Sequence, residues 1–151
     1  MVEMGRTMLR RALLAVLVAA LVALAAAPAA SARTPRLRFA VDGARLTADP
    51  HTLVVSGTYR CPVLDLNVPG GNTIDLTVSQ GGVNGFGGVT VEVCDGTTQT
   101  WQAEVTTFGE PAFTTGRASA LASGLVFARD PAGQEVTLRV DLRDQRIRIR
   151  G

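Results

Sequence analysis

Residues 52–61 read Thr-Leu-Val-Val-Ser-Gly-Thr-Tyr-Arg-Cys. Leu53, Val55, Gly57, Tyr59 and Cys61 fall on one side of an extended chain, because successive side chains of a strand point to opposite faces. These residues are apolar or small, whereas the residues between them are mostly polar. We therefore expect a β-strand whose odd-numbered face enters the core, with Cys61 pointing inward.

The same alternation places strands along most of the remaining chain, and no window has the apolar spacing of an amphipathic helix. Turn signals separate them, including Asp42-Gly43, Pro69-Gly70-Gly71 and the hairpin signal Asp95-Gly96. We expect residues 62–72 to be a loop and Gly81–Gly88 to be a flexible hairpin tip. The other expected strands cover residues 37–41 continuing over 44–47, 73–79, 89–94, 99–107, 113–122, 125–127, 136–142 and 146–150.

The last two of these strands are predicted to form a hairpin. Asp144-Gln145 separates two alternating runs and can turn the chain. Pairing Leu142 with Ile147 and Val140 with Ile149 would put all four on one face, and Asp141 would then lie opposite Arg148.

Seven to eight short antiparallel strands with turn residues between them are typical of an all-β domain. The pattern favours an immunoglobulin-like two-sheet sandwich with one disulfide, and a closed barrel is the alternative.

The N-terminal 32 residues have the pattern of a secretory signal peptide. Arg6, Arg10 and Arg11 precede the apolar run Ala12–Ala27, and Ala30 and Ala32 suit a signal peptidase site. We expect cleavage between Ala32 and Arg33, which leaves residues 33–151 as a single domain. The alternative, an uncleaved membrane anchor, would need about 20 apolar residues, and the run Ala12–Ala27 is shorter than that. Sec export is favoured over the twin-arginine route, because the residues around Arg10-Arg11 match the twin-arginine signal poorly.

Charge argues against binding to nucleic acid. The chain has 15 basic residues, all arginine, and 13 acidic residues. Three of the arginines and Glu3 lie in the signal segment, so the mature domain is close to neutral. After cleavage we expect a secreted, extracellular protein with neither a nucleic-acid partner nor a membrane partner.

Cys61 and Cys94 are the two cysteines, and in an oxidising compartment they are expected to form a disulfide. The sequence around them, Gly57-Thr58-Tyr59-Arg60-Cys61 and Val93-Cys94-Asp95-Gly96 with the downstream Trp101, resembles a family of small secreted actinobacterial proteins defined by a domain of unknown function. The likeness extends over roughly Leu37 to Val126. It implies a secreted sandwich with one disulfide and brings no known activity.

Catalytic and metal-binding patterns are weak. A hydrolase triad could use His51 with Ser56 and Asp42 or Asp49, but no nucleophile motif surrounds Ser56. One histidine and two oxidised cysteines do not make a zinc site, and Asp65-Leu66-Asn67 lacks the remaining ligands of a calcium loop. We therefore expect no enzyme activity, no metal and no cofactor.

The strongest candidate for a ligand surface is a row of arginines near the C-terminus. These residues project from the polar face of the predicted hairpin and are Arg139, Arg143, Arg146, Arg148 and Arg150. They could bind a cell-wall polyanion such as teichoic acid, or an acidic extracellular protein. Alternatively, charged side chains on an outer strand protect a sheet edge from aggregation.

The sequence thus predicts a non-enzymatic extracellular binding or interaction module. One alternative is a protease inhibitor that presents the loop Pro62–Gly71 beside Cys61, and a second is a hydrolase that depends on His51.

Overall fold

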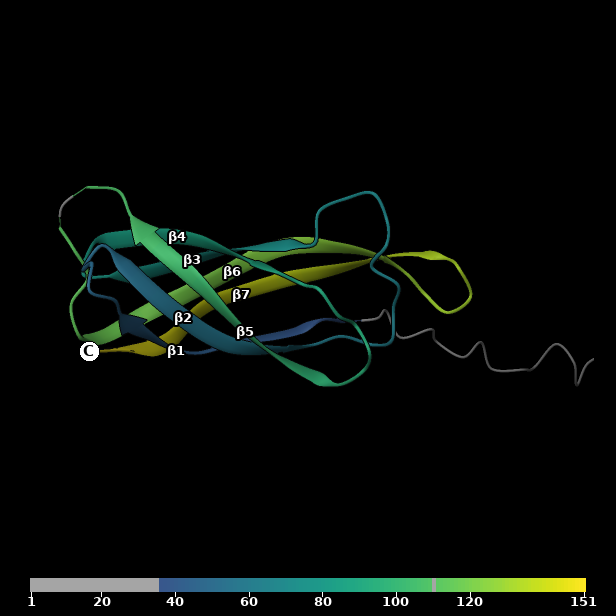
Figure 1. Cartoon of the computed structure of the whole chain (residues 1–151), viewed down its shortest axis with the longest axis horizontal. Coiled ribbons are helices and arrows are strands. Elements are labelled where there is room, and N and C mark those ends of the chain that lie inside the picture. The colour runs from purple at the N-terminus through teal and green to yellow at the C-terminus, as the bar shows by residue number, and fades with distance from the viewer. Residues whose placement is uncertain (1–35, 110) are drawn as a thin grey trace, which may run out of the picture. The chain divides into compact units, whose positions relative to one another are not determined.

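The computed structural model describes residues 36–109 and 111–151. The predicted signal peptide, residues 1–32, and its predicted cleavage site between Ala32 and Arg33 lie outside the described residues. The described chain is all β, as predicted (Figure 1). Its strands are β1 (Arg38–Leu46), β2 (Thr52–Arg60), β3 (Thr73–Gln80), β4 (Val83–Thr90), β5 (Thr98–Thr107), β6 (Gly116–Arg129) and β7 (Glu135–Arg150).

These strands form one closed barrel in the order β1-β2-β5-β4-β3-β6-β7, and β7 returns to β1. The prediction of an immunoglobulin-like two-sheet sandwich is therefore wrong. A sandwich would keep β1-β2-β5 apart from β4-β3-β6-β7, but two seams join these groups. At one seam Gly85 and Phe86 of β4 pair with Thr107 and Thr106 of β5. The other seam, between β7 and β1, is parallel rather than antiparallel.

The β1–β7 seam has only two backbone pairs, and a side chain extends it. Ala44 lies beside Ile149 and Arg45 beside Arg150. Farther along, the carboxamide of Gln145 accepts a hydrogen bond from the backbone N–H of Val41 at 3.2 Å and donates one to the Val41 carbonyl oxygen. Gln145 thus supplies the donor and the acceptor that a neighbouring strand would have offered, and it helps to close the barrel.

The glycine-rich residues Gly81–Gly88 are a strand over most of their length, not the predicted loop. Only Gly81 and Gly82 form the turn, and both have positive φ. A Cβ at Gly85 would lie 2.8 Å from the ring of Phe113, and one at Gly87 would collide with the Glu104 carbonyl. Glycine is needed here because β4 passes so close to its neighbours.

The predicted C-terminal hairpin is also wrong, because β7 is one continuous strand of 16 residues. A bulge interrupts its pairing with β6, so that Leu142 lies opposite Ala122 and Gln145 opposite Ala120. Asp144 occupies this bulge with a φ of 54°. The bulge shifts the inward–outward alternation by one residue, which allows Leu142 and Ile147 both to face the interior. The two strands expected at residues 113–122 and 125–127 are likewise one strand, β6, which covers Gly116–Arg129.

The barrel interior explains the motif around the cysteines. Gly57 pairs with Trp101, and a Cβ at Gly57 would collide with the indole. The same indole stacks on Phe39 at a centroid distance of 5.0 Å. Cys61 and Cys94 form the predicted disulfide, with Cα atoms 5.2 Å apart and both residues buried.

Candidate anion-binding face

All five arginines that the sequence singled out are exposed on the outer side of β7. They do not face each other across a hairpin, because β7 does not turn. Arg139 and Arg143 precede the bulge at Asp144, whereas Arg146, Arg148 and Arg150 follow it. The bulge keeps both groups on the outer side, and it divides the predicted row into two parts with different electrostatic surroundings.

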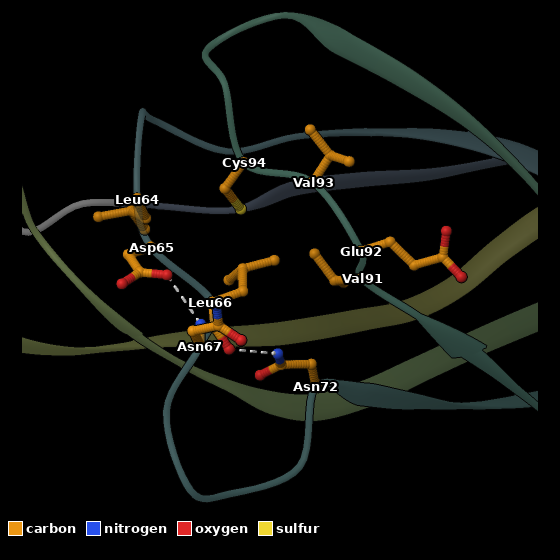
Figure 2. Close-up of a pocket in the computed structure, with 9 residues that line it drawn as sticks. All are labelled: Leu64, Asp65, Leu66, Asn67, Asn72, Val91, Glu92, Val93 and Cys94. Carbon is orange, nitrogen blue, oxygen red and sulfur yellow. Dashed lines mark hydrogen bonds between the residues drawn. The ribbon is translucent and has the colours of Figure 1, made fainter.

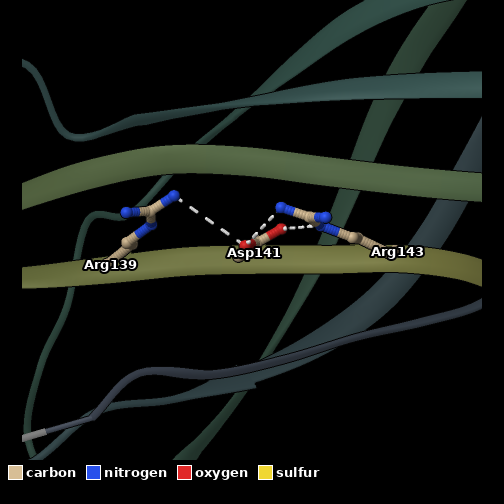
Figure 3. A network of polar contacts seen from close by, with 3 residues as sticks. All are labelled: Arg139, Asp141 and Arg143. Atoms are coloured by element: carbon tan, nitrogen blue, oxygen red, sulfur yellow. Dashed lines mark hydrogen bonds and ion pairs between the residues drawn. The ribbon is translucent and has the colours of Figure 1, made fainter.

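The part before the bulge contains an acid, which offsets half of the positive charge of its two arginines. Asp141 lies between Arg139 and Arg143 on the same side of β7 (Figure 3). The Nε–H of Arg143 donates to the carboxylate of Asp141 at 2.9 Å, and Arg139 forms an ion pair with it at 3.8 Å. The hydrogen bond from Arg143 is the largest cause that lowers the pKa of Asp141. These two arginines are therefore already engaged with a negative charge.

The part after the bulge has no such acid. None of the ion pairs within residues 36–109 and 111–151 includes Arg146, Arg148 or Arg150. Instead, Arg117 of β6 pairs directly with Arg148, and Arg45 of β1 pairs with Arg150. Like charges directly opposite each other on a sheet are destabilising. We call these five exposed residues on three strands the arginine face: Arg45, Arg117, Arg146, Arg148 and Arg150.

Two of its members were missed by sequence reasoning. Arg45 and Arg117 lie far from β7 in the sequence, and only the pairing of β1 and β6 with β7 brings them beside it. Asp42 and Asp144, which lie on the same strands, are exposed, and neither forms an ion pair with an arginine in the described part of the chain.

The loop proposed as an inhibitory segment, Pro62–Gly71, lies beside the disulfide and is held by hydrogen bonds. The Leu64 N–H donates to the Cys94 carbonyl at 2.9 Å, and Asp65 and Arg129 exchange two backbone bonds of 2.8 Å. Leu64 and Leu66 pack against the core. A groove of about 520 Å³ lies between this segment and residues 91–94. Figure 2 shows the side chains that line it.

The residues of the conceivable hydrolase triad are not assembled. His51 Nδ1 lies 3.1 Å from the hydroxyl of Thr107, and its backbone N–H donates to Asp49 at 3.0 Å. That backbone bond is the largest cause that lowers the pKa of Asp49. Ser56 is five residues farther along extended chain, roughly 17 Å away at 3.3 Å per residue.

The described residues offer no cluster of metal ligands. They contain no group of three or more histidine, cysteine, aspartate or glutamate side chains that could hold a metal ion. The Asp65 carboxylate accepts the N–H of Asn67 at 2.9 Å. No helix within the described ranges has the length and apolar character needed to span a membrane.

Comparison with known proteins gives no family. No family model and no curated protein matches the chain. The solution structure of a candidate late embryogenesis abundant (LEA) protein is similar, with a TM-score of 0.41 and 13% sequence identity over 99% of this chain and 91% of that one. This likeness is too distant to assign a function. Membership of the actinobacterial family stays a prediction.

Proposed function

We propose that the protein is a secreted, non-enzymatic binding module whose arginine face holds an anionic polymer of the cell wall. The observation that carries this proposal is the direct opposition of Arg117 and Arg148, and of Arg45 and Arg150, without an acidic partner in the described residues. A polyanion would relieve the repulsion between these pairs. The disulfide is compatible with an extracellular location.

The topology supports ligand binding over edge protection at this face. Edge protection is useful where a strand has a partner on one side only. Glu135–Arg143 is such a stretch, since within the described residues it pairs with β6 alone. The stretch that carries Arg146, Arg148 and Arg150, in contrast, is joined to β1 at both ends. Gln145 bonds to the Val41 backbone at one end, and Ile149 and Arg150 pair with β1 at the other. The arginines on this edge stretch are Arg139 and Arg143, which contact Asp141. Protection of a sheet edge therefore does not account for the arginine face.

The chemistry of the face suits a phosphate-rich polymer. Guanidinium groups are always charged, and their planar forks match phosphate oxygens. Exposed arginines spread over three neighbouring strands can contact successive charges of a flexible chain without a deep pocket. Binding of this kind depends on counterion release and weakens as salt rises.

Titration of the oxidised domain 33–151 with poly(glycerol phosphate) at several salt concentrations tests the proposal. We expect Arg146→Ser with Arg148→Ser to weaken binding and to reduce the slope of log K against log salt by roughly 0.7–0.9 for each phosphate that an arginine no longer neutralises. The matched control, Arg139→Ser with Arg143→Ser, removes the same formal charge from the same strand and should change both quantities much less. Equal effects of the two double variants, or binding unchanged by either, would contradict the assignment.

A further inference from the structure

A groove of about 480 Å³ lies at one side of the arginine face, next to the β3–β4 turn. Its size is within the range of small-ligand pockets, about 300–1,000 Å³. Three strands and one turn contribute to its wall. The polar and charged side chains that line it are Ser79, Gln80, Arg117, Ser119 and Arg146.

The sheet register places these donors around one point. Ser119 on β6 lies directly opposite Arg146 on β7, and on its other side opposite Ser79 on β3. Arg117 is the preceding outward position on β6, so it is diagonal to Arg146. Directly opposite residues have Cβ atoms about 5 Å apart, and diagonal ones about 7–8 Å. Both guanidinium groups can therefore reach a ligand that lies against Ser119.

The wall of the groove is fixed before any ligand arrives. The Gln80 carboxamide accepts the Thr114 N–H at 2.9 Å and donates to the carbonyl oxygens of Thr114 and Arg117 at 2.9 and 3.4 Å. These bonds anchor the start of β6, where Arg117 is located. The Ser79 hydroxyl is also engaged, because it donates to Asn84 at 2.7 Å. The half-buried Ser119 hydroxyl, by contrast, has no hydrogen-bond partner in the part of the chain that the structure describes.

We infer that this groove binds one phosphate group of a phosphodiester polymer, with Arg117 and Arg146 on its charged oxygens and the Ser119 hydroxyl as a third donor. This inference rests on the proposed function and names the chemistry that the site selects. A planar carboxylate is satisfied by one bidentate arginine. Donors converging from two strands, together with a hydroxyl, suit a tetrahedral anion better. The remaining arginines of the face then contact neighbouring phosphates.

The test compares two polymers that carry different anions, poly(glycerol phosphate) and poly-L-glutamate, at the same ionic strength. We expect the wild-type domain to prefer the phosphate polymer. Ser119→Ala keeps every charge, and it should weaken binding of the phosphate polymer about fivefold or more while binding of poly-L-glutamate stays unchanged. Ser123→Ala is the matched control, because Ser123 is an exposed serine on the same face of β6 outside the groove. It should leave both affinities unchanged.

The outcomes separate this inference from the proposed function. If neither polymer binds, the proposed function fails. If both bind equally and Ser119→Ala has no effect, the arginine face is a general polyanion surface and the phosphate site is refuted. A single-stranded oligothymidylate carries the same phosphodiester on a different backbone. Oligothymidylate that binds more tightly than poly(glycerol phosphate) would overturn the assignment to a wall polymer. Circular dichroism of Ser119→Ala confirms that the variant is folded.

Discussion

Replacement of Arg148 by glutamate should stabilise the free protein and weaken its binding to poly(glycerol phosphate). Arg148 lies directly opposite Arg117, and no acid neutralises either residue in the described ranges. A directly opposed charge pair contributes about 0.2–1 kcal/mol, with a sign that depends on the charges. Exchanging repulsion for attraction should therefore raise the free energy of unfolding by about 0.5–2 kcal/mol. For a domain of this size, that corresponds to a rise in Tm of roughly 2–8 °C.

Thermal unfolding followed by circular dichroism measures this effect at low salt and at 1 M salt. The gain should shrink at high salt, where the screening length falls to about 3 Å. Arg148→Gln removes only the repulsion and should give about half of the gain. Arg143→Glu is the opposite control on the same strand: it breaks the bond with Asp141 and should lower Tm. The reasoning is refuted if Arg148→Glu lowers Tm, or if its gain is the same at both salt concentrations.

Three further predictions concern the disulfide, the β1–β7 seam and the two arginines that contact Asp141. Replacing Cys61 and Cys94 by serine removes the disulfide, which joins residues 33 positions apart, and should lower the free energy of unfolding in urea by about 3.7 kcal/mol. A loss below about 1 kcal/mol would show that the disulfide hardly restricts the unfolded chain. Gln145→Leu removes both hydrogen bonds to the Val41 backbone and should lower the free energy of unfolding by about 2 kcal/mol. Amide hydrogen exchange in β1 should become faster, and unchanged exchange there would argue against a role of Gln145 in closing the barrel. Asp141→Asn should strengthen poly(glycerol phosphate) binding at pH 7, because it releases Arg139 and Arg143. Since the pKa of Asp141 is lowered in the fold, the stability that its ion pairs contribute is present above the usual value of 3.8 and is lost as pH falls below it. The wild type should accordingly gain affinity only as the pH falls below 3.8, and the variant should gain less over the same range; an equal gain in both would contradict the role of Asp141.

Local alternation was sufficient to predict much of the fold. Leu53, Val55, Tyr59 and Cys61 are buried, as expected from their spacing in β2. The disulfide could be predicted because the sequence contains only two cysteines. These features depend on residues close in sequence or on composition alone, and no long-range pairing has to be known to infer them.

The predictions of a C-terminal hairpin and of a glycine-rich loop are wrong because each local pattern is compatible with two structures. A shift in alternation between Leu142 and Ile147 is produced equally well by a turn and by a bulge, and Asp144 suits either because aspartate tolerates positive φ. The sequence Gly85-Phe86-Gly87-Gly88 is typical of a loop, yet its glycines allow β4 to pass close to Phe113 and Glu104. Only the neighbouring strands decide between these possibilities.

Closure of the barrel and assembly of the candidate site share this dependence on distant pairing. The choice between sandwich and barrel rests on a few backbone pairs at the two seams, one of which joins β1 to the last residues of β7. The same register places Arg45 beside Arg150, and the β6 register places Arg117 beside Arg148. Alternation along β7 could predict the exposed arginines of that strand, but not their partners.

The most direct test of the arginine face is an NMR titration of the isotope-labelled domain 33–151 with poly(glycerol phosphate), observing the arginine side-chain Nε–Hε signals. The signals of Arg117, Arg146 and Arg148 should shift with one common affinity that falls with salt, whereas those of Arg139 and Arg143 should move little. Larger shifts for Arg139 and Arg143, or shifts confined to the loop Pro62–Gly71, would contradict the assignment of the anion-binding surface.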